Sequence, residues 1–270
     1  MSFILVPLTY SFMQRGLLAA TIVGILCAVI GVYVVLRGMA FLGDALAHAI
    51  LPGVAIAYIF GGNLLVGALV AAIVVAVSVG YFSRTGTVKE DTAIGILFAA
   101  ALSLGVALIS SIRTYAVDLS HILFGNVLGV SPTDLWLTAG LGLVVLLTVF
   151  LLYRPFMVIS FDPVLAATLR LPTELLRNVM LILLAVTIVI SLQTVGVGLG
   201  AAMLVTPAAT AYLLTKRLPT MMLVSAGLGA FAAIVGLYAS YYLNIVSGSA
   251  IVLTSTIVFM LVFLAKRGKR

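Results

Sequence analysis

Residues 16–36 read GLLAATIVGILCAVIGVYVVL, a run without a charged side chain. A helix of about 20 apolar residues crosses roughly 30 Å of hydrocarbon, so this run is long enough to span a bilayer. Similar runs recur to the end of the chain: 64% of the 270 residues are apolar, 8% are charged, and the mean hydropathy is +1.36. These values exclude a soluble globular domain and predict an all-α, polytopic membrane protein.

The apolar runs between charged residues and Gly or Pro breaks define the membrane segments. The nine predicted segments are 16–36, 44–60, 64–82, 93–112, 134–153, 178–195, 201–215, 220–243 and 249–265. Segments 44–60 and 201–215 are short and contain proline, so each is either a full span or partly re-entrant. We therefore expect eight or nine transmembrane helices in a single domain over residues 1–270, with no cleavable signal at its start.

Lys and Arg are distributed unevenly between alternate loops, and this predicts the orientation of the chain. Of the 14 Lys and Arg residues, only Arg15 and Arg113 fall on the side of the N-terminus. The other twelve fall on the side of the C-terminus, which is therefore expected to be cytoplasmic, with the N-terminus outside. Because the net charge of +7 is spread over these loops, we expect the chain to face a lipid bilayer and no nucleic acid.

The longest predicted inner loop, residues 154–177, is the least apolar part of the chain and predicts two short helices at the cytoplasmic surface. Asp162 is a good N-cap, and Pro163 suits the first position of a helix. Pro172 ends that helix, and Thr173 can start the next. The loop is either a docking element for a soluble partner or an ordinary capped connection.

Asp44 and His48 are the only ionisable residues after Arg37 in a stretch that is otherwise small or apolar. Their i, i+4 spacing places both on one face of a helix. A carboxylate within hydrocarbon costs about 2.5 to 3.5 kcal/mol on insertion scales, so such a residue usually lines a pathway or has a partner. The pair is a structural polar pair, a proton relay, or half of a metal site that a two-fold axis would complete with two Asp and two His.

Other polar residues bear on this choice. No Glu, Lys or Arg is clearly placed near the middle of a span to continue a proton relay, which favours the metal site. His121, with Asp118 three residues earlier, falls in a predicted outer loop and is expected to be a surface histidine. Residues 196–211 are rich in Gly, Ala and Thr, and Pro207 predicts a kink, so this helix either lines the pore or packs closely against its neighbours.

Four stretches of the chain resemble the metal-ion permeases of ABC importers, the group that includes zinc and manganese uptake permeases. They are FLGDALAHAILPGVA at 41–55, LFGNVLG at 123–129, SFDP at 160–163 and VTPAATA at 205–211. They follow one another in the order of that family, and the likeness covers nearly the whole chain. The resemblance implies a homodimeric permease like those of type II importers, in a bacterial cytoplasmic membrane, with cytoplasmic ATPase subunits and an external metal-binding protein.

The resemblance also implies roles for single residues. Asp44 and His48 match the polar pair of the translocation path, and residues 160–177 match the segment that couples to the ATPase. The residues expected to couple are Asp162, Pro163, Ala166, Leu169 and Pro172, and those expected to line or gate the path are Thr206, Pro207 and Thr210. Independently of the resemblance, Arg15 and Arg113 are the only positive side chains on the predicted outer face, so both are expected to dock the external protein, with the alternative that Arg15 only anchors a helix end at the headgroups. Arg170 departs from the pattern, because similar proteins usually carry Gly there.

No Walker A pattern occurs in the chain, so ATP hydrolysis is expected in a separate subunit and the chain itself is not expected to be an enzyme. The expected function is alternating-access uptake of Mn²⁺ or Zn²⁺, with Fe²⁺ also open, without a permanently bound cofactor. The alternatives are a stand-alone secondary metal or proton-coupled transporter, which should show inverted repeats, and an intramembrane enzyme, which would need a catalytic motif.

Overall fold

The computed structural model describes residues 6–84, 90–111, 127–194 and 196–267, which contain helices and no β-strand. The helices run in the order α2 (Ser11–Leu36), α3 (Ala40–Ala49), α4 (Leu51–Ile59), α5 (Leu64–Arg84), α6 (Glu90–Ser110), the 3₁₀ turn η1 (Val127–Gly129), α8 (Pro132–Leu151), α9 (Tyr153–Phe161), α10 (Pro163–Thr168), α11 (Thr173–Thr194), α12 (Val197–Leu214), α13 (Leu218–Leu243) and α14 (Ser247–Arg267). The prediction of an all-α membrane protein is confirmed.

Eight helical spans in the described residues are long and apolar enough to cross a membrane, and a ninth apolar helix, Gly200–Leu214, is shorter. One of the eight spans, Ala40–Ile59, consists of α3 and α4, which meet at Ile50. Pro52 has no N–H to donate to the carbonyl of His48 four residues earlier, which accounts for the break at this point. Of the two short, proline-containing segments, 44–60 is divided into two helices, whereas 201–215 lies in one continuous helix, α12, with Pro207 inside it.

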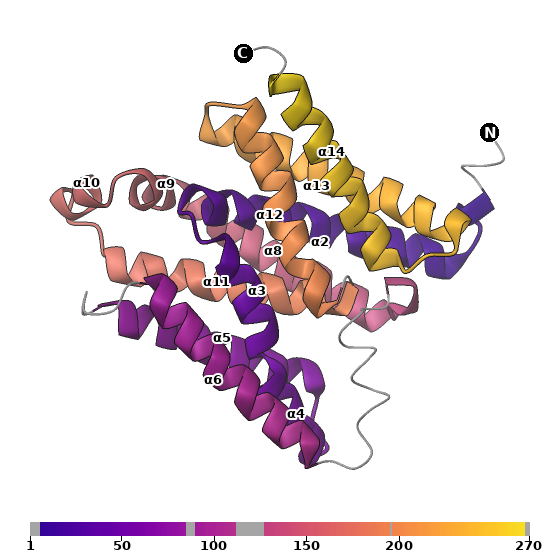
Figure 1. Cartoon of the computed structure of the whole chain (residues 1–270), viewed down its shortest axis with the longest axis horizontal. Helices are drawn as coiled ribbons and strands as arrows, with labels where there is room; N and C mark the ends of the chain where they lie inside the picture. The colour runs from indigo at the N-terminus through magenta and orange to yellow at the C-terminus, as the bar shows by residue number, and fades with distance from the viewer. Residues whose placement is uncertain (1–5, 85–89, 112–126, 195, 268–270) are drawn as a thin grey trace.

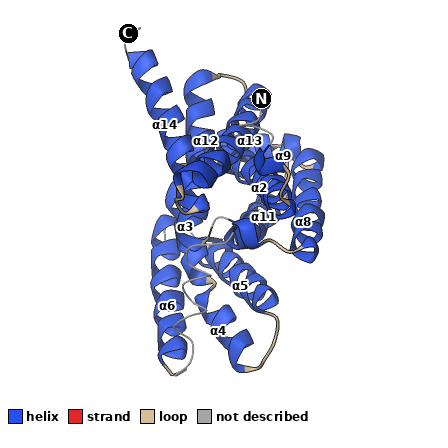
Figure 2. Ribbon diagram, turned by 90° about the vertical axis from the view of Figure 1, so that its right-hand side faces the viewer, coloured by secondary structure: helices blue, strands red, loops and turns tan. Residues whose placement is uncertain are grey.

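The spans form three groups that Figures 1 and 2 show from two directions. Helices α4, α5 and α6 lie at one side, α12, α13 and α14 lie at the other, and α2, α8 and α11 lie between them. Helix α3 crosses this arrangement and contacts α5, α6, α11 and α12. It therefore lies where the three groups meet.

Helix α2 is the most enclosed span, and small residues allow its neighbours to approach it closely. A Cβ atom added at Gly24 would lie 2.7 Å from the carbonyl oxygen of Gly229 on α13. At Gly31 it would overlap with the carbonyl oxygen of Leu204 on α12. Glycine at these two positions therefore sets how closely α12 and α13 pack against α2.

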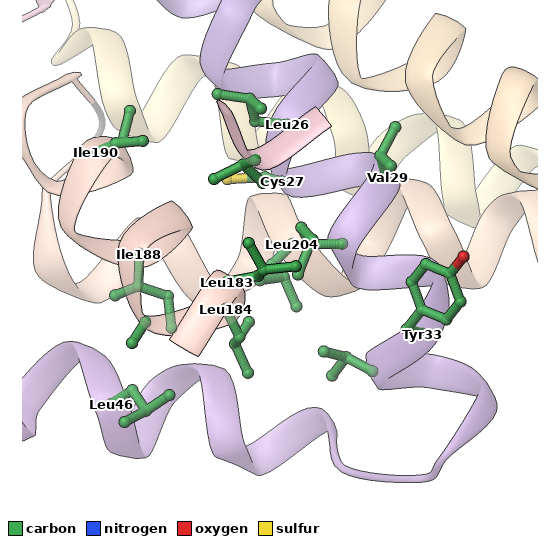
Figure 3. Packing of buried hydrophobic residues seen from close by; sticks show 14 of the residues in the cluster. Leu26, Cys27, Val29, Tyr33, Leu46, Leu183, Leu184, Ile188, Ile190 and Leu204 are labelled. Atoms are coloured by element: carbon green, nitrogen blue, oxygen red, sulfur yellow. The ribbon is translucent and has the colours of Figure 1, made fainter. Parts of the chain in front are cut away.

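Buried apolar side chains connect α3 to this packed centre, as Figure 3 shows. Cys27 and Tyr33 of α2 belong to the same hydrophobic cluster as Leu184 and Ile188 of α11. Leu46 of α3, with 1% of its surface exposed, belongs to this cluster too. The backbone of α3 is thus held by Leu46 on the face opposite to Asp44 and His48.

Helices α9 and α10 lie at one end of the molecule, beyond the first turn of α11 (Figure 1). Asp162 caps α10 as predicted, since its carboxylate accepts the N–H of Leu165 at 2.9 Å. The helix predicted to begin at Thr173 does begin there, but it continues to Thr194 as span α11. The prediction of a short surface helix at that position is wrong, because the apolar run after Thr173 contains nothing that would end the helix.

Candidate functional site

The polar pair of α3 lies on its less covered face. His48 Nε2 and Asp44 Oδ1 are 3.7 Å apart, which is close enough for electrostatic attraction but too long for a hydrogen bond. The His48 side chain is 28% exposed and the Asp44 side chain 41%, whereas Ala45 and Ala47 beside them are buried. The two polar groups are therefore left accessible at the centre of a helix whose other face is packed.

An aromatic side chain of α6 covers one edge of this pair. The ring of Phe98 lies 6.0 Å from the ring of His48 and 6.0 Å from the ring of Phe41, measured between centroids. Phe98 thereby limits the directions in which the imidazole can turn. The sequence contains no signal for this role, because Phe98 is one apolar residue within an apolar span and only the packing of α6 on α3 brings it to His48.

The described part of the chain supplies few metal ligands. It contains no group of three or more His, Cys, Asp and Glu residues that could hold a metal ion. The pair of α3 offers one imidazole nitrogen and one carboxylate, whereas Zn²⁺ takes about four ligands and Mn²⁺ favours about six. Asp44 and His48 of one chain can therefore form only part of a coordination shell.

Helix α12 begins next to this pair. A Cβ atom added at Gly43 would lie 3.7 Å from the Cβ of Ala201, an ordinary packing distance. Farther along α12, Pro207 is buried inside the helix, and the hydroxyl of buried Thr210 donates to the carbonyl of Thr206 at 2.8 Å. The structure thus brings the start of α12 to α3, while the Thr210 hydroxyl is already bonded within its own helix.

The residues predicted to couple lie at a different place, on and around α10. Val164 is 76% exposed and Leu169 56%, whereas Ala166 is fully buried. Pro163 is the first residue of α10, and Pro172 is exposed just before α11. An exposed apolar helix with a firm N-terminal cap is suited to contact with another protein.

Arg170 adopts the left-handed conformation, with φ of 52°. Its N–H donates to the carbonyl of Ala167 at 3.0 Å, and the N–H of Leu171 donates to that of Ala166 at 3.1 Å. These two bonds form a Schellman turn, whose left-handed position favours glycine. Arg170, where similar proteins usually carry Gly, therefore occupies the one position of this turn that favours glycine.

The predicted outer residues are described only in part. Arg15 lies near the start of α2, and its Nε donates to the carbonyl of Ser11 at 3.3 Å. Arg113, His121 and Asp118 lie outside the described residues, as do the first four positions of the 123–129 stretch. The structure therefore does not bring Arg15 and Arg113 together as a described pair.

Comparison with known proteins gives the chain a family. Residues 9–266 match the ABC 3 transport family. The chain is 50% identical to the manganese transport system membrane protein MntC of Halalkalibacterium halodurans, over 95% of this chain and 88% of that protein. It is 45% identical to the manganese import system permease protein ScaB of Streptococcus parasanguinis, over 94% of this chain and 90% of that protein.

A solved structure agrees with these sequence matches. The structure of PsaBC from Streptococcus pneumoniae in complex with Fab superposes with a TM-score of 0.86 and 39% identity, covering 97% of this chain and 94% of that chain. The predicted resemblance and the expectation of a metal-importer permease are confirmed, and the stand-alone transporter and the intramembrane enzyme are set aside. The chain belongs to the ABC 3 transport family, as a multi-pass permease of a bacterial cytoplasmic membrane.

Proposed function

We propose that two copies of this chain form the membrane pore of an importer for Mn²⁺, in which Asp44 and His48 of both copies bind the ion during its passage. The observation that carries this proposal is the accessible Asp44–His48 pair, 3.7 Å apart on the face of α3 that its own chain leaves open. A carboxylate in this setting is unfavourable unless something binds to it. A divalent cation can bind both the Asp44 carboxylate and the His48 imidazole.

Symmetry completes the coordination shell. A two-fold axis beside α3 would bring together two carboxylates and two imidazoles, with water filling the remaining positions. Such a site holds Mn²⁺ through oxygen and nitrogen ligands without enclosing it, so the ion can leave again. Weak binding suits a transporter, which must release its cargo on the other side of the membrane.

Manganese is the proposed cargo because the relatives named above are manganese import permeases. The ligands themselves are less selective, since Asp and His also suit Zn²⁺ and Fe²⁺. We therefore assign discrimination between metals to the whole importer, including an external binding protein that delivers the ion. Arg15 is the described outer residue that we propose for contact with that protein.

The energy for transport comes from separate ATPase subunits that contact α10. The exposed apolar side chains of Val164 and Leu169 supply the contact, and the cap at Asp162 keeps α10 in place when force is applied. This assignment places α10 and the C-terminus in the cytoplasm, in line with the Lys and Arg distribution. Helix α12, with Pro207 in its interior, is the proposed gate beside α3.

The test is Mn²⁺ uptake per assembled transporter in vesicles. Asp44→Asn and His48→Ala should each lower uptake at least a hundredfold, because in the dimer Asp44→Asn removes the two negative charges that attract the dication and His48→Ala removes two imidazole ligands. Asp134→Asn is the matched control, since Asp134 belongs to a capping box with Ser131 far from the pair in sequence. Uptake within twofold of the unaltered protein in both site variants, with normal assembly, would refute the proposed site.

A further inference from the structure

A cleft of about 970 Å³ opens between the end of α12, the start of α13 and the end of α14. Four cationic side chains line it: Lys216 and Arg217 from the link between α12 and α13, and Lys266 and Arg267 from the end of α14. All four are exposed, and no Asp or Glu is among the lining residues. The cleft therefore carries a concentrated positive charge that no acidic side chain in its lining offsets.

Helix-end electrostatics do not explain the whole of this cluster. Lys266 and Arg267 lie in the last turn of α14, where a cation interacts favourably with the helix dipole. Lys216 directly follows Thr215, the C-cap residue of α12, where a cation is favoured, so only Arg217, the N-cap residue of α13, lies at a helix end where a cation is disfavoured. An external anion would offset that unfavourable placement.

The walls of the cleft are apolar, and this favours an anion that also has an apolar part. Tyr212 is 56% exposed and Phe263 is 42% exposed, and both line the cleft beside the cations. A free phosphate would use the cations and leave these rings uncovered, whereas an amphiphile would cover both. Mn²⁺ itself is excluded as the occupant, because four positive charges repel a divalent cation.

We propose that this cleft binds an anionic phospholipid, with its phosphate between the four cations and its acyl chains along the wall that contains Tyr212 and Phe263. The cleft lies at the end of the molecule that the Lys and Arg distribution assigns to the cytoplasm, where anionic headgroups meet basic pockets between transmembrane helices. The bound lipid links α12, the proposed gate, to α13 and α14. It thereby stabilises the end of α12 that lines the cleft.

Native mass spectrometry of the full chain in detergent tests this proposal, with phosphatidylglycerol compared against phosphatidylcholine. The unaltered protein should retain phosphatidylglycerol preferentially, and Lys216→Gln/Arg217→Gln should weaken that retention by about 25-fold, at about fivefold for each cation lost. Arg154→Gln/Arg170→Gln is the matched control, because it removes two exposed cations elsewhere on the same chain. Its preference for phosphatidylglycerol should stay within twofold of the unaltered protein.

A salt titration of the unaltered protein provides a second measurement that does not depend on any variant folding. The preference for phosphatidylglycerol should fall as ionic strength rises, since the contact is electrostatic. Equal retention of both lipids would overturn the proposal. So would glycerol phosphate displacing the lipid at equal concentration, which would indicate a free-anion site, or loss of ATPase binding in Lys216→Gln/Arg217→Gln with lipid retention unchanged, which would indicate a protein-docking surface.

Discussion

Two short helices, α3 and α10, each have an aspartate, Asp44 in the middle of α3 and Asp162 at the N-cap of α10, and the two carboxylates are used differently. Asp162 accepts the N–H of Leu165 at 2.9 Å and so satisfies an N–H that the first turn of α10 would otherwise leave open. Asp44 Oδ1 lies 3.7 Å from His48 Nε2, which is too far for a hydrogen bond. The hydrogen bond of Asp162 explains its role within its own helix, whereas for Asp44 we propose a partner from outside the chain.

The apolar surfaces of the two helices show the reverse pattern. Helix α3 buries its apolar face, including Leu42 and Leu46, inside the chain. Helix α10 exposes Val164 and Leu169. In a single chain, the Asp44–His48 pair of α3 supplies too few ligands for a metal site. The apolar face of α10 has no partner surface to cover it. Both observations are expected of a chain that works only in a larger assembly.

After the site variants of α3, the largest expected effect is at the exposed apolar face of α10. Val164→Glu should lower Mn²⁺ uptake at least tenfold while ATP hydrolysis by the assembled transporter continues, because a charge would enter an apolar contact with the ATPase subunit. Val164→Leu is the control, since it keeps the contact apolar, and it should retain most uptake. If Val164→Glu transports normally and uptake is lost only through another inner loop, α10 is not the coupling helix.

A second test of this comparison concerns Phe98, which covers one edge of the Asp44–His48 pair of α3. Phe98→Ala should lower uptake about fivefold by releasing the His48 ring, a loss of roughly 1 kcal/mol that is typical of one aromatic contact. Phe98→Leu keeps the bulk and should recover part of that loss. Measuring Mn²⁺ uptake against ion concentration checks the cause, since a loss of ring orientation should raise the half-saturating concentration.

A residue in the left-handed conformation lies just before α3 and another lies just after α10. Substitutions at these two positions should have a smaller effect, which is on stability. Gly38, just before α3, has φ of 68°, and a Cβ atom there would touch nothing within 4 Å. Gly38→Ala should therefore destabilise the protein by about 1 kcal/mol through backbone strain alone. Arg170→Gly should stabilise it by about 0.5 kcal/mol, since relief of strain is partly offset by the added freedom of glycine in the unfolded chain.

Thermal unfolding of the purified protein in detergent measures both changes. Arg170→Ala separates the backbone effect from the charge, because Ala removes the guanidinium but keeps the strain. It should unfold at the same temperature as the unaltered protein. Equal stabilisation by Arg170→Gly and Arg170→Ala would show that charge, and not the left-handed backbone, governs this turn.

Much of this architecture follows from hydropathy, because the cost of placing polar groups in lipid dominates where spans form. Most of the predicted segments begin later than the helices, as with 93–112 against Glu90–Ser110 and 178–195 against Thr173–Thr194. Hydropathy counts only apolar residues, whereas helices extend into polar first turns such as the one with Glu174, where the helix dipole favours an acid.

The candidate metal site on α3 could be predicted only in part. The i, i+4 spacing of Asp44 and His48 is local, so the sequence was enough to place them on one face. The contact of Phe98 with His48 joins two helices that are distant in sequence, and the helix break after His48 lies near Pro52. The Phe98 contact cannot be read from periodicity, because it arises from packing between elements, whereas the break follows from the missing N–H of Pro52, which the sequence does show.

The smallest expected effect concerns Arg15, at the end of α2 remote from α10. The Arg15 side chain is partly exposed and donates to the carbonyl of Ser11, so its charge remains available to a partner while its position is fixed. Arg15→Glu should weaken binding of the external metal-binding protein about threefold at low ionic strength, since a peripheral charge contributes less than about 1 kcal/mol. The difference should vanish at high salt, because the Debye length shortens to about 3 Å at 1 M. Gln14→Glu adds the same negative charge one residue away without removing the cation, so it should produce a smaller change. Identical affinities for all three proteins across the salt series would mean that Arg15 only anchors the end of α2 at the headgroups.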